Sequence, residues 1–484
     1  METQPPLPSD IWDRTPPEAQ AYIEALVARV TALEATVKDL TERSEQNSHN
    51  SSRPPSSDGP SKKKRERRRR QPSGRGVGGQ PGHRGQTREL IPVDEVDEVI
   101  ALKPSSCAVC HHELAGEDPQ PHRHQVLEIP PMCPVVTEYQ VHRLDCEVCG
   151  ATTIGAWPQG VPTGIIGPRA QAIASLCTGA YRLSKRTTQR VLDDLFGLSL
   201  SVGTISHLEA ATTEALEAPV EEARAYVQEQ ASAHLDETGW REGGKRAWLW
   251  VASTTWVTVF LVRLSRGSQV AKELLGERFS GILVTDRWSA YNWYPVRWRQ
   301  LCWAHLLRDF EAMIGRGGAS KEIGEALKSQ ANQMFHWWHR VRDGTLSRSS
   351  FRTYMTPVRR EVERLLEAGS CCEVDKTEGM CRDILKRRQA LWTFVHLKGV
   401  EPTNNDGERA IRSGVLWRKV SFGTHSARGS RFAESMLTVV TTLKQQERHV
   451  LDYLTAACQA ALCDEPAPSL LPDVEAASSS QIAA

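Results

Sequence analysis

The chain contains 484 residues, 39% hydrophobic and 25% charged, a composition typical of a soluble protein long enough for two or three domains. Its net charge of +1 hides strong segregation. Residues 51–90 hold twelve Lys and Arg against three Asp and Glu, whereas residues 91–130 hold two against eight. No run of about 18 apolar residues occurs, and the N-terminus lacks the basic and apolar regions of a signal peptide. These features argue against a membrane-spanning or secreted protein and predict a cytoplasmic one with a polyanionic partner.

Residues 16–45 carry an apolar heptad repeat. β-branched residues fill every first core position of the heptad, and leucines fill every second one, which favours a parallel two-stranded coiled coil. We therefore expect a homo-oligomer, at least a dimer. The alternative is an amphipathic helix that packs on its own chain, because fewer than three heptads stabilise an isolated dimer only weakly. The repeat consists of Ile23, Leu26, Val30, Leu33, Val37 and Leu40.

Residues 46–90 are predicted to be a disordered basic arm, because Asn, Ser, Pro and Gly surround the run KKKRERRRR. Such an arm gains affinity from phosphate neutralisation and counterion release, so it binds DNA of any sequence. A solvated charge run, or a segment that binds another polyanion, is the alternative. The predicted DNA-binding residues are Lys62, Lys63, Lys64, Arg65, Arg67, Arg68, Arg69 and Arg70.

Residues 91–160 contain two C-x-x-C pairs, Cys107 with Cys110 and Cys146 with Cys149, separated by 35 residues. Four thiolates close a tetrahedral structural zinc site, so we predict a zinc-binding module with one Zn²⁺. The interval is long, and one or two hairpins are expected to fill it. Free or redox-active thiols are the alternative. The residues that compete as ligands are His111, His112, His122, His124 and Cys133.

Residues 165–226 have helical apolar spacing, with Gly197 ending one helix and Ser201 capping the next. A helix, a short turn and a second helix predict a helix-turn-helix-like DNA-binding region with 201–217 as the recognition helix. A helical hairpin without DNA contacts has the same pattern and is the alternative.

From residue 227 to 447 the pattern predicts an α/β catalytic domain of the RNase H-like class. Three strands, a helix and a fourth strand follow one another, with Asp236 expected at the end of the first strand and Asp286 at the end of the fourth. A helical stretch, about 306–398, separates these strands from a helix that carries Glu408. Residues 448–484 are expected to form a C-terminal helix and tail.

Three acids on rigid neighbouring elements suit phosphodiester chemistry. Cleaving and rejoining DNA uses two Mg²⁺ (or Mn²⁺) ions about 4 Å apart, and these ions prefer carboxylate oxygens and water. Asp236 alone reads as a strand cap, Asp286 as a turn former and Glu408 as an exposed helix acid. Together with the strand order they predict a catalytic triad that binds two metal ions.

Five segments resemble the transposases of insertion sequence family 66, a branch of the DDE transposases. They are HLDETGW (234–240), VTDRWSAY (284–291), LCWAHLLRDF (301–310), NNDGERAIR (404–412) and WRKVSFGT (417–424). The resemblance extends over nearly the whole chain, including the basic arm with GGQPGH. It implies a bacterial, nucleoid-associated enzyme whose DNA partners are the element's terminal repeats and a target, with accessory element-encoded proteins. Asp236, Asp286 and Glu408 are then its catalytic acids, and the helical stretch its insertion.

Two departures from the family pattern stand close to the acids. Asp286 is followed by Arg287 and Trp288 instead of a small residue and an aromatic, and Gly407 precedes Glu408 where Ala is more usual. Gly407 is expected to loosen the helix by up to about 1 kcal/mol. Glu237 is expected to face away from the site, because neighbouring strand residues point to opposite faces.

Five further residues are predicted to support the acids. His305 and Arg308 belong to the motif LCWAHLLRDF. The other three residues are expected on the same helix face as Glu408. A structural core histidine and an ion pair with Glu408 are the alternatives for His305 and Arg412. The five are His305, Arg308, Asn404, Asn405 and Arg412.

Two rival functions fit parts of this pattern. A nuclease of the same fold would hydrolyse DNA without strand transfer, and a zinc-containing DNA-binding regulator would do no chemistry. Acids at all three catalytic positions argue against the regulator.

Overall fold

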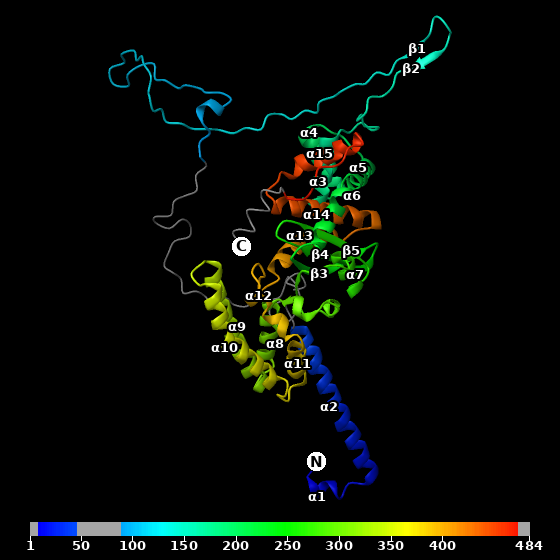
Figure 1. Ribbon diagram of the computed structural model, residues 1–484, viewed down its shortest axis with the longest axis vertical. Helices are drawn as coiled ribbons and strands as arrows, with labels where there is room; N and C mark the ends of the chain where they lie inside the picture. The colour runs from blue at the N-terminus through cyan, green and yellow to red at the C-terminus, as the bar shows by residue number, and fades with distance from the viewer. Residues whose placement is uncertain (1–7, 46–88, 473–484) are drawn as a thin grey trace. The chain divides into compact units, whose positions relative to one another are not determined.

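The computed structural model describes residues 8–45 and 89–472 (Figure 1). The chain divides into two compact units, one of residues 59–135 and the other of residues 1–58 with 136–484. The predicted basic residues from Lys62 to Arg70 lie outside the described residues. None of the described helices is long and apolar enough to cross a membrane.

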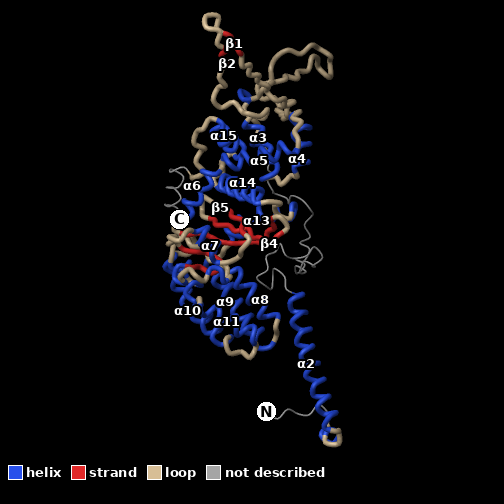
Figure 2. The backbone as a smooth tube through the Cα atoms, turned by 90° about the vertical axis from the view of Figure 1, so that its right-hand side faces the viewer, coloured by secondary structure: helices blue, strands red, loops and turns tan. Residues whose placement is uncertain are grey.

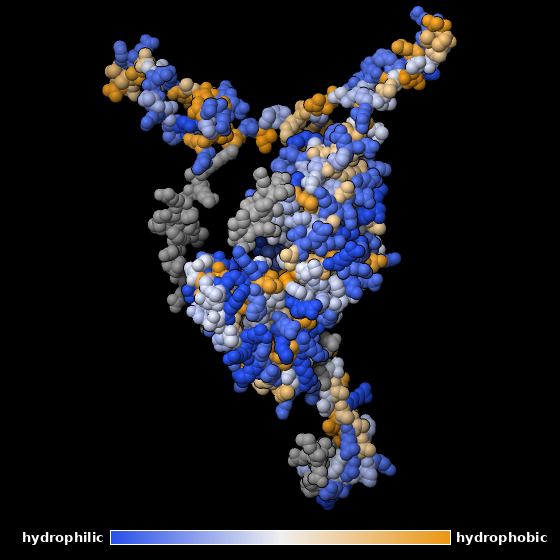
Figure 3. All heavy atoms as spheres, viewed as in Figure 1, coloured by the Kyte–Doolittle hydropathy of each residue, from blue (hydrophilic) through white to orange (hydrophobic). Residues whose placement is uncertain are grey.

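The predicted heptad segment forms one uninterrupted helix. After α1 (Ser9–Trp12), α2 runs from Pro17 to Glu45. Its apolar side chains stay in solvent, since Leu26 is 44% exposed and Val37 61% exposed, and they mark the surface along α2 in Figure 3. The helix thus presents an apolar stripe, and the pairing of that stripe in a coiled coil stays a prediction.

The unit of residues 59–135 has little regular structure in its described part. A 3₁₀ turn, η2 (Val93–Glu95), follows Ile91, whose backbone N–H and carbonyl both bond to the Gln125 amide at 2.9 and 2.8 Å. In the other unit, β1 (Arg143–Asp145) and β2 (Thr152–Ile154) form a short antiparallel hairpin. Residues 114–142 contain no helix or strand, so the hairpins expected in the interval between the cysteine pairs are not present.

Four helices follow the hairpin in the chain and precede the large sheet. Local signals set their ends: the hydroxyls of Ser184 and Ser201 accept N–H bonds three residues ahead, from Thr187 and Thr204, and Gly197 adopts a φ of 64° after the second helix. The helices are α3 (Pro168–Gly179), α4 (Lys185–Phe196), α5 (Val202–Ala215) and α6 (Glu217–Gln228).

A five-stranded mixed sheet follows, in the order β5-β4-β3-β6-β7. Figure 2 shows its strands in red between helices. The first three strands form an antiparallel meander, and β6 and β7 add parallel strands beside β3. Helix α7 (Ser268–Leu275) connects the meander to β6. This arrangement fits the expected catalytic domain of a DDE transposase. The strands are β3 (Ser232–Glu242), β4 (Lys245–Ser253), β5 (Thr258–Arg263), β6 (Ile282–Thr285) and β7 (Arg299–Leu301).

A helical bundle occupies the stretch predicted as an insertion and has its own core. Strand β6 lies between two cores, because Leu283 packs into that of the sheet while Ile282 and Val284 pack into that of the bundle. Trp303 and Trp392, both almost fully buried, contact each other in the bundle core with ring centres 5.1 Å apart. The bundle contains α8 (Trp303–Gly315), α9 (Gly318–Arg342), α10 (Arg348–Gly369), α11 (Asp375–Lys386) and α12 (Thr393–His396).

Three C-terminal helices complete the fold: α13 (Asn405–Ser421), α14 (Ala427–Gln445) and α15 (Val450–Leu462). Helix α14 closes the edge of β5, where every second backbone N–H would otherwise lack a partner. Side chains four residues apart on α14 accept these N–H groups, because two strand residues and one helical turn advance by similar distances. The bonds run from Val262 to Glu434, from Phe260 to Thr438 and from Thr258 to Thr442, at 2.6, 3.0 and 3.0 Å.

Helix α5, predicted as the recognition helix, packs against α3, α14 and α15, and its Thr212 hydroxyl lies 2.8 Å from that of Ser175 in the interior. Its sequence contains no Lys or Arg. The neighbouring α4, in contrast, exposes Arg186 and Arg190. Recognition of DNA by α5 stays a prediction.

Helix α13 approaches the sheet closely at Gly414. A Cβ atom there would lie 2.1 Å from Leu249 Cδ2 of β4, a fully buried side chain. Gly414→Ala should therefore lower the free energy of unfolding, because overpacking costs about 1–3 kcal/mol and exceeds the helix-propensity gain of up to about 1 kcal/mol. Thermal unfolding checks this.

The matched control is Gly379→Ala in α11, where nothing lies within 4 Å of the added Cβ. This variant should be stabilised by up to about 1 kcal/mol. Equal shifts of the two melting temperatures would show that the contact with Leu249 is not tight.

Candidate active site

The three predicted acids lie on three elements of the catalytic domain. Asp236 is within β3, paired with Val251 of β4, so the prediction that it ends the first strand is wrong. The strand continues to Glu242 because its hairpin with β4 turns only at two glycines with positive φ, Gly243 and Gly244. Asp286 directly follows β6, and Glu408 lies in the first turn of α13.

Alternation along β3 turns Asp236 toward α13. His234, two residues before it, bonds through Nδ1 to the Asn404 Oδ1 at 3.0 Å, and Thr238, two residues after it, accepts from Arg418 at 3.0 Å. Residues two apart on a strand share a face. Asp236 therefore points toward the side of the sheet that α13 covers.

The acids interact electrostatically. Burial raises the pKa of Asp236 well above its ordinary 3.8, and the negative charges of Glu237, Asp286 and Glu408 raise it further, against the opposing effect of His305. Among the described residues the three acids do not form a single three-ligand group. Half-buried, mutually repelling carboxylates have the oxygen donors that Mg²⁺ and Mn²⁺ prefer.

Asp236→Asn should stabilise the metal-free protein at neutral pH. Because the native pKa of Asp236 lies above its unfolded value, its contribution to stability is fully present below about pH 4 and is lost as the pH rises through the native pKa. Each unit of that difference corresponds to about 1.4 kcal/mol. Melting temperatures measured with a chelator from pH 4 to pH 8 should diverge, with the variant increasingly the more stable.

Added Mg²⁺ should narrow the difference, because an ion held by Asp236 would neutralise its charge in the wild type and has no such ligand in the variant. The exposed Asp194, on α4, provides the control, and Asp194→Asn should leave the pH dependence unchanged. A variant that melts below the wild type at pH 8 would contradict the role of burial and repulsion.

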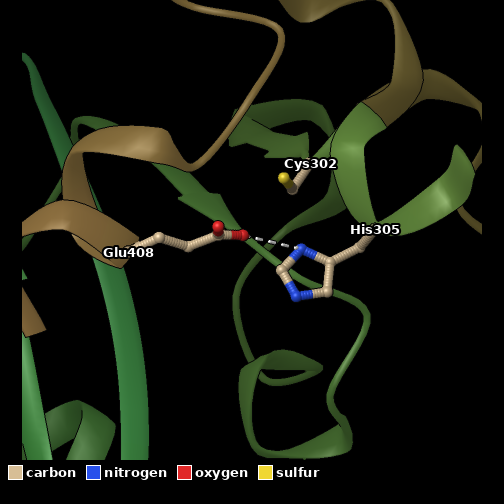
Figure 4. A group of neighbouring side chains, drawn as sticks. All are labelled: Cys302, His305 and Glu408. Carbon is tan, nitrogen blue, oxygen red and sulfur yellow. Dashed lines mark ion pairs between the residues drawn. The ribbon is translucent and has the colours of Figure 1, made fainter. Parts of the chain in front are cut away.

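Helix α8 holds Glu408 by one carboxylate oxygen. His305 Nδ1 lies 3.4 Å from Glu408 Oε1 (Figure 4), and Arg308 Nη2 lies 3.5 Å from the same oxygen. Burial disfavours a charged His305, but the Cys302 sulfur and the Asp286 carboxylate outweigh it and raise its pKa to about 10. Both predicted neighbours of the site therefore contact Glu408 and leave its second oxygen for other ligands.

The first turns of α8 and α13 are tied together. The Trp303 N–H donates to the Pro402 carbonyl at 2.9 Å, and the Asn404 N–H donates to the Cys302 sulfur at 3.1 Å. Asn404 also donates through Nδ2 to the Leu235 carbonyl of β3 at 2.7 Å. Asn404 thus precedes α13 and links it to the strand of Asp236, so its predicted place on the helix face of Glu408 is wrong.

The link between the Asn404 amide and β3 also explains why a glycine, Gly407, precedes Glu408. A Cβ at Gly407 would lie 2.9 Å from Asn404 Oδ1, so the small residue leaves room for the buried amide that joins α13 to β3. The predicted supporting residues Asn405 and Arg412 are both exposed on α13, and their roles stay predictions.

The second departure, Arg287, anchors the insertion. Its guanidinium pairs with Asp309 of α8 at 2.7 Å and with Asp383 of α11 at 2.6 Å. The next residue, Trp288, donates its N–H to Asp286 Oδ1 at 2.8 Å. One residue after Asp286, the chain is therefore joined to two helices of the bundle.

Glu237 faces the opposite side of β3, as alternation requires. It pairs with Arg266 at 2.7 Å and accepts a short hydrogen bond from the Tyr291 hydroxyl. Arg266 in turn stacks on Trp288, with its guanidinium carbon 3.9 Å from the ring centre. The sequence alone did not indicate this group, because its members come from strand β3 and two separate loops, and Arg266 belongs to none of the family motifs.

The first cysteine pair forms a tight turn. The Cys107 N–H bonds to the His112 carbonyl at 2.8 Å, and His111 adopts a φ of 60°. Backbone N–H groups of Cys110 and Val109 point at the Cys107 sulfur and lower its pKa. A lowered pKa favours the thiolate form that binds metal.

The second pair repeats this local geometry. The Cys146 N–H bonds to the Ala151 carbonyl at 2.8 Å, Gly150 adopts a φ of 71°, and the N–H groups of Cys149 and Val148 lower the pKa of Cys146. Each pair by itself therefore has the form of a metal-binding knuckle.

Comparison with known proteins supports the resemblance of the motifs. The transposase IS66 family matches residues 165–432, more than half of the chain, and a family of unknown function (DUF6444) matches residues 3–89. An uncharacterized protein of Sinorhizobium fredii, y4qI, is 28% identical over 240 residues, and the match covers 43% of each chain. The chain thus spans less than half the length of that relative. Because the first match includes Asp236, Asp286 and Glu408, we conclude that this chain belongs to the transposase IS66 family.

Proposed function

We propose that this transposase cleaves DNA strands at the ends of its insertion sequence and joins them to a target, using Asp236, Asp286 and Glu408. The observation that supports this most is the acid cluster, in which the pKa of Asp236 is raised by burial and by the other carboxylates. Repulsion between such carboxylates destabilises the fold when no cation is bound. Groups with strongly shifted pKa values are concentrated at active sites. Strand transfer, as opposed to hydrolysis alone, belongs to the proposal.

Asp236, Asp286 and Glu408 would hold two Mg²⁺ or Mn²⁺ ions, which when bound activate the attacking oxygen and stabilise the leaving one. His305 and Arg308 lie beside one oxygen of Glu408, and in this proposal they hold the carboxylate in place for the metal ions. The N-termini of α8 and α13 meet at the site, and their partial positive charges favour carboxylates and phosphates there.

DNA is the proposed partner, both as terminal repeats and as target. The basic arm, outside the described residues, would supply contacts that do not depend on sequence. Exposed Arg186 and Arg190 of α4 add cations within the helical region. The exposed apolar stripe of α2 would join two copies of the chain, so that the two ends of the element are held by one assembly.

The test uses the full chain with a duplex that carries the terminal inverted repeat from the DNA flanking the gene, together with a supercoiled target. Cleavage at the repeat and joining to the target, both dependent on Mg²⁺ or Mn²⁺, are expected. Cleavage without joined product would support the rival nuclease. Specific binding with no cleavage in either metal would support the rival regulator.

We also propose that Cys107, Cys110, Cys146 and Cys149 bind one structural Zn²⁺. The similar knuckles and the lowered pKa values of Cys107 and Cys146 support this. Cys146→Ser should reduce the zinc content and increase proteolysis between residues 91 and 160, since metal binding and folding are coupled. Cys371→Ser, at an exposed cysteine of the bundle, should change neither. Equal zinc in all three proteins would exclude this ligand set.

A further inference from the structure

A cysteine, a histidine and a glutamate meet where α8 and α13 begin (Figure 4). One ligand atom from each of Cys302, His305 and Glu408 lies within 4.8 Å of the other two. Among the residues that the structure describes, this is the one group of three His, Cys, Asp or Glu side chains placed to hold an ion together.

Two of these atoms are buried without a hydrogen-bond partner: His305 Nδ1 and Glu408 Oε1. His305 is only 9% exposed, and its Nδ1 points at Glu408 from 3.4 Å. That distance is long for an N–H···O bond, whose range is about 2.7–3.2 Å. Two ligands of one tetrahedral ion with bonds of about 2.0–2.1 Å stand about 3.3 Å apart, which matches the spacing found.

The sulfur completes the set. Cys302 is 1% exposed, and its sulfur accepts the Asn404 N–H at 3.1 Å. The thiolate is the form of cysteine that binds metals. The same Asn404 backbone connects directly to the helix of Glu408, so the bonds that hold Cys302 also hold the glutamate near it.

We propose that Cys302, His305 and Glu408 form a site for a transition-metal ion such as Zn²⁺, and that an ion bound there withdraws Glu408 from Asp236 and Asp286. Sulfur, nitrogen and oxygen ligands together suit Zn²⁺, whereas Mg²⁺ takes oxygen ligands. Three protein ligands leave a fourth position open. The withdrawal of Glu408 rests on the proposed function, but the metal site does not.

The site is tested with the full chain and Co²⁺ as a spectroscopic probe, with Zn²⁺ content measured in parallel. Wild type should bind one more equivalent of Zn²⁺ than either Cys302→Ser or His305→Gln. Both variants should also lose part of the thiolate-to-cobalt charge-transfer absorption. The control protein, Cys107→Ser with Cys146→Ser, should keep that part, because its knuckle cysteines are not ligands of this site.

Two variants are used because one of them can misfold, and circular dichroism identifies a folded one. Unchanged zinc content and cobalt spectra in a folded variant would overturn the proposal and leave an ion pair between His305 and Glu408. The proposed withdrawal of Glu408 from the two aspartates is tested by adding Zn²⁺ to the Mg²⁺-dependent cleavage reaction. Wild type should lose at least about tenfold in rate, as expected when one ion displaces a ligand of another, and Cys302→Ser should lose less relative to its own rate without Zn²⁺.

The two proposals fail in different ways. Zinc bound by Cys302 and His305 in a protein that cleaves no DNA with any metal would support the site while refuting the catalytic function. Zinc-insensitive cleavage by wild-type protein that does bind zinc at Cys302 would refute the withdrawal of Glu408.

Discussion

Glu408→Gln should reduce DNA cleavage and strand transfer by on the order of 10³-fold or more, because it removes a charge that the metal ions need while keeping the side-chain shape. Asp236→Asn and Asp286→Asn should be as severe. Pairs of these substitutions should be little worse than single ones, since residues that act as one unit are not additive. The measurement is the single-turnover rate on a terminal-repeat duplex in Mg²⁺ and in Mn²⁺.

Binding of the same duplex should survive in all three variants, because the proposed DNA contacts lie in the basic arm and on α4. Asp406→Asn is the matched control. Asp406 lies in the same first turn as Glu408 and is 48% exposed at its side chain, and its substitution should leave the rate within a few-fold of wild type. A Glu408→Gln protein that binds and cuts at more than a tenth of the wild-type rate would refute the assignment.

Arg287→Met should destabilise the insertion bundle by about 3–5 kcal/mol, the cost of leaving a buried charge without its partner. The side chains of Arg287 and Asp309 are only 17% and 5% exposed. Burial raises the pKa of Asp309 even with Arg287 beside it. Without the guanidinium, Asp309 must take up a proton or draw in water. Hydrogen exchange should accelerate in α8 and α11, and the thermal midpoint should fall.

A double-mutant cycle separates the interaction energy of Arg287 and Asp309 from the effects of their other contacts. Arg287→Met with Asp309→Leu should regain part of the lost stability, because apolar side chains can replace a buried ion pair. The exposed pair of Arg364 and Glu361, in α10, is the control, and Arg364→Met should cause no measurable change. A double variant no more stable than Arg287→Met alone would mean that the arginine acts through other contacts.

Much of the local structure could be predicted from the sequence. Gly197 and Ser201 bound their helices where the pattern expected, and the acid after β6 ends its strand as expected. These features depend on residues within about four positions of one another, so a single stretch of chain contains the information. The family motifs likewise predicted the three acids and the family. The match over residues 165–432 confirms the family.

The features that sequence reasoning missed depend on contacts between distant segments. Asn404 was expected to share the face of Glu408, but its amide joins β3, about 170 positions earlier in the chain. Arg287 was seen only as a departure from a pattern, and its partners lie 22 and 96 positions away. Cys302 was not predicted as a neighbour of Glu408, because only the pairing of two helix starts brings them together.

The length of β3 also shows the difference between what local sequence determines and what contacts between distant segments determine. A run of alternating residues indicates a strand, but where that strand ends depends on its partner. Nine pairs with β4, continuing to the glycine turn, place Asp236 in the middle of the strand and not at its end. The sequence thus predicted which residues would carry the proposed chemistry, because carboxylate type and motif are local. Only the tertiary structure decided what surrounds them, because burial, repulsion and buried ion pairs arise when segments distant in the chain pack together.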